Sequence, residues 1–392
     1  MSPRLWSKEF IVSIAVNLFM SSVFYLLLTS MATYAVAEFQ ASETLAGLAA
    51  SGFIIGAVAG RLFSGKFLDF VGRRRLLVIS MAVYVVASIA YIPVSHLWVL
   101  IVLRIIHGIA FGAGNTALVA AVQAIIPTPR RAEGNGYFGT ATTLSTAMGP
   151  FLAVWLSQHV GFDAIFLLST VCALGALVAS RFFTVPEREP SDEERQHLWK
   201  MHLTSFIEPK ALKIGLIMLI SGTAYASVLS FLAIHTEKLF IPNASSAFFI
   251  AYSVATLFAR LFAGRLQDQF GDNIVAIPVF LLFTVGMVLV GLSTTTFLMV
   301  VAGVTLGLGF GTTIPMMQAM LINQTPAARL GVATSTFFLM LDIGSGVGPV
   351  ILGSIGEQTG FPTMFIIAAL FALVAGVLYV LFHGRHVRRP QP

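Results

Sequence analysis

The sequence predicts an all-α membrane protein in which twelve transmembrane helices form two parallel six-helix repeats. Three observations support this fold class. Hydrophobic residues make up 57% of the 392 positions and charged residues only 10%, with a mean hydropathy of +0.89. Long apolar stretches follow one another along the whole chain. A sequence pattern that begins at Arg61 returns 199 positions later, at Arg260.

The composition excludes a soluble globular protein, because so few polar residues cannot cover the surface of a chain of this length. The apolar stretches run for roughly 17 to 30 residues without two-residue alternation, which indicates membrane-spanning helices and excludes a β-barrel. In chain order, we expect these helices near residues 10–32, 45–63, 76–92, 97–126, 135–157, 163–184, 212–235, 245–263, 274–292, 296–322, 332–356 and 362–383.

The first stretch resembles a secretory signal, since Arg4 and Lys8 precede it and Ala35-Val36-Ala37 follows it. We expect it to be retained, because it is longer than the roughly 7 to 15 apolar residues of a signal peptide. Cleavage would also leave the equivalent apolar stretch near 212–235 without a counterpart in the first half of the chain. The single cysteine, Cys172, excludes a disulfide framework and a thiolate metal site, and we expect no metal site.

The positive charges predict the orientation of the chain in the membrane. If both termini are cytoplasmic, nearly all Lys and Arg residues lie in the termini, in cytoplasmic loops or at inner helix ends; only Lys238 lies outside and Arg104 within a span. This asymmetry favours a multi-pass protein of a bacterial inner membrane with both termini in the cytoplasm. Because the basic residues are spread over separate loops, they do not indicate a nucleic-acid partner.

The internal repeat divides the chain. The offset of 199 positions persists without a gap, as in the pairs Gly108 and Gly307, Pro127 and Pro326, and Gly149-Pro150 and Gly348-Pro349. We expect an N-terminal six-helix bundle at residues 1–185, a charged cytoplasmic linker at 186–211 and a C-terminal six-helix bundle at 212–392. An even number of spans per half makes the repeats parallel, an arrangement in which two bundles can rock about a midplane site.

The loop after the second span carries a specific motif. Glycines, an aspartate and arginines occur in Gly65-Lys-Phe-Leu-Asp69-Phe-Val-Gly72-Arg73-Arg74, and the second copy keeps Gly264 and Asp268. This pattern resembles motif A of the major facilitator superfamily, and span count, repeat and linker fit that family over the whole chain.

The resemblance implies the major facilitator fold and a conformational latch formed by Gly65, Asp69, Gly72, Arg73, Arg74, Gly264 and Asp268. Physically, the glycines allow a tight turn, and Asp69 can face the positive N-terminus of the helix that begins near Gly331. A plain positive-inside anchor is the alternative.

The fourth span resembles motif B of the same family in the residues Leu103-Arg104-Ile-Ile-His107-Gly108. An arginine inside a span costs about 3 kcal/mol unless it faces a partner or a cavity. We therefore expect a functional role for Arg104. For His107, we consider two alternatives of equal standing, a role in proton coupling and a hydrogen bond between helices.

Asp342 is the acid that we expect near the middle of the membrane, about ten residues into the eleventh span. Its counterpart in the repeat is Thr143, so the carboxylate belongs to the second half alone. Burial and a nearby Arg104 would shift its titration in opposite directions. We expect Asp342, Arg104 and His107 to couple protons to transport; a structural partner for an arginine is the alternative for Asp342.

The fifth span resembles part of motif C, which accompanies exporters of the drug:proton antiporter type. It carries Gly136 and Gly149-Pro150 but has Ser145 where the motif has glycine, and Ala153-Val154 where it has a glycine pair. The resemblance favours export, and close packing of small residues is the alternative. It also implies that spans 1, 4, 7 and 10 line a central cavity. The expected cavity residues are Asn17, Phe24, Tyr25, Asn115, Tyr225, Met316 and Gln318.

Together these features predict a proton-coupled secondary transporter that exports a small amphipathic or aromatic molecule by alternating access. The alternative is a proton symporter that imports a sugar or an organic anion. No phosphate-binding Gly-rich motif or catalytic motif is found, so we expect neither ATP hydrolysis nor an enzyme. The expected driving force is a proton gradient without any cofactor. The expected partners are a small-molecule substrate, protons and the lipid bilayer, with the protein as a monomer; the cargo stays open.

Overall fold

The computed structural model describes residues 5–41, 43–184, 187–191, 206–241 and 243–386. All regular secondary structure in these residues is helical. Contacts divide the chain into two compact units: Met1–Pro127, Leu144–Glu208 and Thr325–Thr336 form unit 1, and Thr128–Thr143, Pro209–Gln324 and Phe337–Pro392 form unit 2. Most of the linker expected at 186–211 lies outside the described residues.

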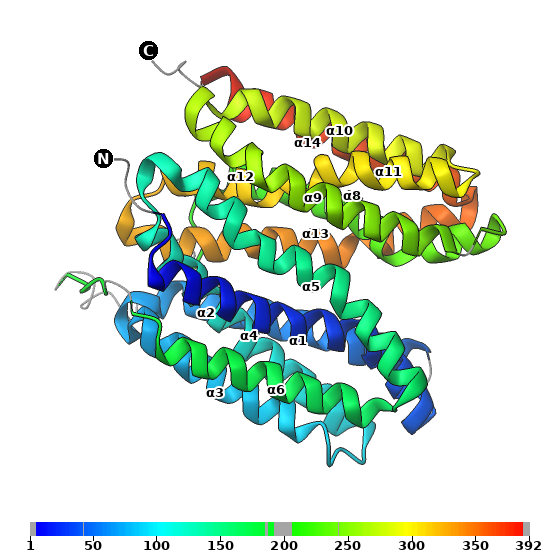
Figure 1. Ribbon diagram of the computed structural model, residues 1–392, viewed down its shortest axis with the longest axis horizontal. Coiled ribbons are helices and arrows are strands. Elements are labelled where there is room, and N and C mark those ends of the chain that lie inside the picture. The colour runs from blue at the N-terminus through cyan, green and yellow to red at the C-terminus, as the bar shows by residue number, and fades with distance from the viewer. Residues whose placement is uncertain (1–4, 42, 185–186, 192–205, 242, 387–392) are drawn as a thin grey trace. The chain divides into compact units, whose positions relative to one another are not determined.

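Unit 1 is a helix bundle. It contains α1 (Lys8–Phe39), α2 (Glu43–Val71), α3 (Arg73–Ala90), α4 (Leu97–Ile125), α6 (Phe162–Arg181), the later part of α5 (Arg131–His159), the turn η3 (Ala327–Arg329) and the first residues of α13 (Leu330–Thr359). Helix α2 packs along α4, and α6 packs against α1 and α3. In Figure 1 these helices run from blue through cyan to green.

Unit 2 is also helical. It contains the turn η1 (Thr128–Arg130), the start of α5, α8 (Ala211–Lys238), α9 (Asn243–Phe270), α10 (Asp272–Leu292), α11 (Thr296–Leu308), α12 (Phe310–Asn323), most of α13, α14 (Phe361–Phe382) and the turn η4 (Gly384–His386). Helix α9 packs along α11, and α14 packs against α8 and α10. These contacts correspond, at the offset of 199 positions, to those of α2, α4 and α6 in unit 1.

Four glycines mark equivalent helix starts. Gly72, Gly161, Gly271 and Gly360 precede α3, α6, α10 and α14, and all four have a positive φ, between 86° and 113°. A residue with a Cβ atom rarely adopts this backbone conformation. Gly72 therefore serves the tight turn that its motif predicts. The same backbone turn recurs 199 positions later at Gly271.

Close helix packing in unit 1 depends on other glycines. A Cβ atom on Gly56 would lie 2.0 Å from the carbonyl oxygen of Ile105, and one on Gly108 would lie 2.0 Å from that of Phe53. Both distances are far below van der Waals contact. The backbones of α2 and α4 can approach each other only because these positions lack side chains.

Ten helices in the described residues are long and apolar enough to cross a membrane. The twelve expected stretches all lie on helices, but α3 and α5 are not among the ten. Helix α3 has 18 residues and begins with Arg73, Arg74 and Arg75. Helix α5 begins with Arg131 and carries many Gly, Thr and Ser residues, which lower its hydropathy. Twelve crossings therefore stay a prediction.

The tenth expected span, 296–322, is interrupted. Helix α11 ends and α12 begins at Gly309, where φ is −77° and ψ is −95°. Pro315 follows inside α12 and has no backbone N–H. The corresponding helix of unit 1, α4, runs without a break from Leu97 to Ile125. The two units therefore differ at this span.

Candidate functional site

In unit 2, the second copy of the motif binds the start of α5. The Oδ1 and Oδ2 atoms of Asp268 accept hydrogen bonds from the backbone N–H groups of Ala132 and Glu133, at 3.1 and 2.9 Å. A carboxylate at this position satisfies free helix N–H groups and interacts favourably with the helix dipole. Gly264 makes the approach possible, because a Cβ atom there would lie 2.5 Å from the Ala132 oxygen.

Glu133 joins this arrangement through two arginines. Its carboxylate accepts hydrogen bonds from Arg130 Nε at 2.7 Å and from Arg265 Nε at 2.7 Å. Hydrogen bonding to Glu133 raises the pKa of the Arg130 guanidinium above its usual value. Glu133 has only 4% of its surface exposed. We call Arg130, Glu133, Gly264, Arg265 and Asp268 the second motif cluster.

In unit 1, the first copy of the motif packs on the start of α13. A Cβ atom on Gly65 would lie 2.6 Å from Cβ of Ser335, and the Ser335 hydroxyl donates a hydrogen bond to the Arg61 carbonyl oxygen at 2.6 Å. Gly65 thus serves a close helix contact and lies within α2, whereas the sequence analysis assigned it to a turn. Gly331 lies at the same contact, against Leu68.

Asp69 has other hydrogen-bond partners than Asp268, its counterpart in the repeat. Its carboxylate accepts hydrogen bonds from Arg73 Nε and from Arg188 Nη1, both at 3.2 Å. We expected Asp69 to face the start of the helix near Gly331, but the hydrogen bonds to helix N–H groups are made by Asp268, at the start of α5. Here a different acid, Glu187, caps α3: its carboxylate accepts hydrogen bonds from the backbone N–H groups of Arg73 and Arg74, at 2.7 and 2.9 Å.

Glu208, near the end of the expected linker, also binds residues of unit 1. Glu208 Oε2 accepts a hydrogen bond from Arg329 Nε at 2.6 Å, and its backbone N–H donates to the hydroxyl of Thr336 at 2.9 Å. Arg329 corresponds to Arg130 in the repeat, but Val332 stands where the other half has Glu133. The carboxylate of Glu208, in the expected linker, therefore binds Arg329 in place of the carboxylate that is missing at Val332. We call Gly65, Asp69, Arg73, Glu187, Arg188, Glu208 and Arg329 the first motif cluster.

No sequence motif places Glu133, Glu187, Arg188 or Glu208 at the site. A weak signal existed for Glu187, because it stands in a charged segment directly after an apolar span. Nothing in the sequence distinguished the other three from ordinary charges of a cytoplasmic loop. The hydrogen bonds described above join them to residues more than 100 positions away in the chain, except for the pair Arg130 and Glu133.

Arg104 is buried inside unit 1 and has 1% of its surface exposed. It donates hydrogen bonds to the carbonyl oxygens of Ala49 and Ala50 on α2, at 3.0 and 3.1 Å. Its guanidinium also lies 4.8 Å from the ring centre of Phe53. Carbonyl dipoles and an aromatic face thus stabilise two of the three guanidinium nitrogens, while the buried Nη1 atom makes no hydrogen bond to the described residues.

His107 is fully buried between α3 and α4. Its Nδ1 atom lies 3.0 Å from the Tyr91 hydroxyl and its Nε2 atom lies 3.4 Å from the Ser88 hydroxyl. Both ring nitrogens therefore have partners across the helix pair. This is the hydrogen-bonded arrangement that the sequence left as one alternative, and a role in proton coupling stays a prediction.

Two further buried arginines occupy equivalent positions in the two units. Arg61 donates to the Asn115 side chain at 3.2 Å. Arg260 donates from Nε and Nη2 to the carbonyl oxygen of Gly311, at 3.2 and 3.0 Å. This oxygen has no helical donor of its own, because the residue four positions later is Pro315. In the sequence, both arginines stand out only as part of the repeat.

The expected cavity residues of unit 1 lie in an aromatic and polar environment. Phe24 stacks on Phe111 with 5.2 Å between ring centres, and it contacts Tyr25 edge to face. Asn17 is buried and accepts a hydrogen bond from Ser21 at 3.2 Å. These residues lie on α1 and α4, as the resemblance implies.

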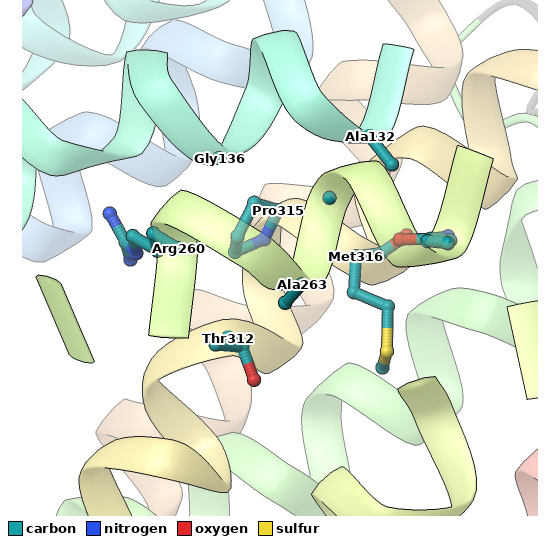
Figure 2. A pocket seen from close by; sticks show the side chains of 9 residues that line it. Ala132, Gly136, Arg260, Ala263, Thr312, Pro315 and Met316 are labelled. Atoms are coloured by element: carbon teal, nitrogen blue, oxygen red, sulfur yellow. The ribbon is translucent and has the colours of Figure 1, made fainter. Parts of the chain in front are cut away.

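The expected cavity residues of unit 2 are also buried. Tyr225 stacks on Phe310 with 4.1 Å between ring centres. Gln318 and Met316 lie on α12, 5% and 3% exposed. Met316 borders a cavity of about 10 Å³ with Arg260, Thr312 and Pro315, and Figure 2 shows Gly136 and Ala132 of α5 on its opposite side. Such a volume suits about one water molecule.

Asp342 is half-buried on α13 in unit 2. Arg104 and His107 belong to unit 1. The pairing of Asp342 with Arg104 therefore stays a prediction, while each residue lies on the helix that the sequence assigned to it.

Comparison with known families decides the identity of the chain. The model of the Major Facilitator Superfamily matches residues 12–249 and 214–392. The chain belongs to the Major Facilitator Superfamily. Its members are transporters, so the helices described above form the scaffold of a membrane transporter.

Relatives within the superfamily cover most of the chain. An uncharacterised MFS-type transporter of Methanocaldococcus jannaschii is 25% identical over 86% of this chain and 88% of the relative. The staphylopine export protein of Staphylococcus aureus is 20% identical over 87% of this chain and 88% of that protein.

Solved structures of superfamily members share the fold. The human organic anion transporter MFSD10 (TETRAN) superposes with a TM-score of 0.81 at 14% identity, covering 95% of this chain and 99% of that one. The transporter FucP in its outward conformation gives a TM-score of 0.74 at 13% identity, covering 96% of this chain and 99% of that one.

Proposed function

We propose that this member of the superfamily is a proton-coupled secondary transporter that exports a small amphipathic or aromatic molecule by alternating access. The observation that carries the proposal is the family match along nearly the whole chain. The export direction is supported by the similarity to a staphylopine export protein over 87% of the chain. The partial motif C at Gly149-Pro150 points the same way.

In this proposal the chain crosses a bacterial inner membrane twelve times, with both termini in the cytoplasm. Helices α3 and α5 cross in addition to the ten apolar spans, with the arginines of α3 at the lipid headgroups. The unbroken offset of 199 positions and the matching turns at Gly72 and Gly271 support two parallel six-helix repeats.

The two motif clusters act as the conformational latch. Helix α5 belongs to the first half of the sequence and α9 to the second, and Asp268 ties their ends. Likewise Gly65 on α2 and Ser335 on α13 bring the two halves together. Transport requires these contacts to form and break once in each cycle, so they set the balance between the two access states.

Asp342 carries the coupling proton, with Arg104 and His107 influencing its titration. A carboxylate inside a span is costly and indicates function by default. Aromatic pairs such as Phe24 with Phe111 and Tyr225 with Phe310 offer flat apolar contact to cargo, and Asn17, Asn115 and Gln318 can orient it.

A growth screen followed by a flux assay tests the function. A deletion strain is compared with its complemented parent on toxic compounds and exported metabolites, and any hit is measured in inverted and right-side-out vesicles with an imposed pH gradient. Proton-driven accumulation in inverted vesicles supports export. Proton-driven uptake in right-side-out vesicles would instead identify a symporter that imports its cargo.

The substitution Asp342→Asn tests the coupling residue. We expect gradient-driven transport to be abolished while energy-independent exchange of cargo continues, because the amide cannot take up and release a proton. Glu357→Gln is the matched control, since it neutralises an exposed acid on the same helix, and it should transport normally. Full gradient-driven activity of the Asp342 variant would refute the assignment.

A further inference from the structure

The second copy of the motif departs from the first directly after its glycine. Asp272 and Asn273 stand where the first copy has Arg73 and Arg74. The structure shows that both residues bind the end of α14 and the turn after it, Asp272 through His383 and Asn273 through Tyr379 and Gly384. The departure therefore creates a polar cluster that the first copy lacks.

His383 is the centre of this cluster and has 15% of its side chain exposed. Its Nε2 atom lies 2.7 Å from Oδ2 of Asp272, and its Nδ1 atom lies 2.9 Å from Nε2 of Gln324, the C-cap residue directly after α12. The other oxygen of Asp272 accepts a hydrogen bond from Gln267 of α9 at 2.9 Å.

Neighbouring bonds extend the cluster. The side chain of Asn273 donates to the carbonyl oxygen of Gly384 at 2.8 Å and accepts from the Tyr379 hydroxyl at 2.7 Å. Gln267 also donates to the carbonyl oxygen of Met316 on α12, at 3.3 Å. One cluster thus connects the ends of α9, α10, α12 and α14.

The hydrogen bonds of His383 depend on its charge. In the neutral ring, Nε2 donates to Asp272 and Nδ1 accepts from the Gln324 amide, as the atoms lie here. In the charged ring both nitrogens donate, so the amide of Gln324 must turn to present its oxygen, and the bond to Asp272 becomes an ion pair. Hydrogen bonds between charged groups are the stronger kind.

Charged and titratable groups of the described residues approach the ring from several elements, and Tyr379 of α14 contacts it with 5.7 Å between the ring centres. Asp272 faces it from α10, and Asp268 of α9 interacts electrostatically with Asp272. Lys213 of α8 lies over the Phe382 ring at 6.0 Å, and Arg385 is exposed in the following turn. The charged state of His383 thus has one carboxylate as its direct partner.

We propose that His383, Asp272 and Gln324 form a pH-responsive tie at the end of unit 2 that the orientation above places in the cytoplasm. Histidine is the side chain that changes charge between about pH 5 and 8. The tie contains an ion pair while the ring is charged and an ordinary hydrogen bond when the ring is neutral, and the ion pair is the stronger of the two. Because it reaches α12, which carries Met316 and Gln318, cytoplasmic pH regulates the mobility of the expected cargo helix separately from the coupling proton.

Thermal unfolding of the purified full-length protein in detergent, at pH 6 and pH 8, tests the tie without any cargo. We expect the melting temperature to be higher at pH 6 than at pH 8 by an increment that His383→Gln and Asp272→Asn each reduce by about 2 °C or more. The double variant should show no further reduction. His96→Gln, which removes an exposed histidine, is the matched control and should keep the full increment.

A second variant keeps the inference falsifiable if His383→Gln does not fold. Gln324→Glu places a carboxylate at Nδ1, so the ring should hold its proton to higher pH and the pH dependence should move upward. An unchanged increment in His383→Gln, or an unmoved profile in Gln324→Glu, would overturn the proposal. Neither result depends on transport, so the proposed function is tested independently.

Discussion

At the scale of single residues, two aspartates of one repeated motif have different partners. Asp268 caps the start of α5, whereas Asp69 accepts hydrogen bonds from Arg73 and Arg188. Sequence repetition thus preserved the carboxylate and not its partners. The partners differ because Glu187 and Arg188 of the linker have no equivalent after the second copy in the described residues.

The substitution Asp268→Asn should weaken the cap of α5. An amide offers one acceptor where the carboxylate offers two, and it loses the favourable interaction with the helix dipole. We expect the free energy of unfolding to fall by about 0.5–2 kcal/mol. Thermal unfolding of the purified protein measures this change.

The comparison variant for this prediction is Glu357→Gln, which neutralises an exposed acid near the end of α13, away from any helix N-terminus. It should alter the unfolding free energy by less than about 0.5 kcal/mol. Equal effects of the two substitutions would show that the bonds to Ala132 and Glu133 contribute nothing to stability.

At the scale of elements, the glycines of α2 make a close helix contact possible. Gly52, Gly56 and Gly60 recur every four residues, which predicts a smooth helix face, and the structure places Gly56 and Gly60 against the backbone of α4. The spacing could not identify the partner, because several helices of the chain carry small residues at similar intervals.

Gly56→Ala should force α2 and α4 apart. The added methyl group would lie 2.0 Å from the Ile105 carbonyl oxygen, which is backbone and cannot move aside alone. We expect a loss of about 1–3 kcal/mol in unfolding free energy. Gly346→Ala is the control, because nothing lies within 4 Å of that added atom. Comparable destabilisation by both variants would contradict the packing of α2 on α4.

The interrupted span of unit 2 gives a second prediction at this scale. Arg260→Met should leave the Gly311 carbonyl oxygen without a donor and cost about 1–3 kcal/mol. Pro315→Ala restores a backbone N–H four residues after Gly311, so the double variant should recover part of that loss. Unfolding of the two single variants and the double variant measures the coupling. Strict additivity would show that the guanidinium does not replace the missing helical bond.

At the scale of the whole molecule, the distribution of charge predicts the topology. A reporter enzyme that works only outside the cytoplasm should be active when fused after Lys238 and inactive when fused after Arg385. A fluorescent reporter that matures only in the cytoplasm should show the reverse pattern. Activity of the external reporter after Arg385 would refute the orientation and would move the His383 cluster to the other face.

The sequence by itself determined the helical membrane architecture, the superfamily and the repeat. Lipid excludes unpaired backbone groups, so apolar stretches of this length must be helices, and an unbroken offset between copies is visible in one dimension. The motif also singled out Gly72, which forms a turn with positive φ, and Asp69 and Asp268, whose carboxylates accept hydrogen bonds.

Only the tertiary structure decided which groups these residues bind. Glu133, Glu187 and Glu208 joined the motif clusters, and His383 found Asp272, through contacts that bring distant parts of the chain together. A charged residue in a loop has the same sequence signal whether it faces water or an arginine. Its partner depends on how the helix ends meet, which the packing of apolar faces and glycines decides.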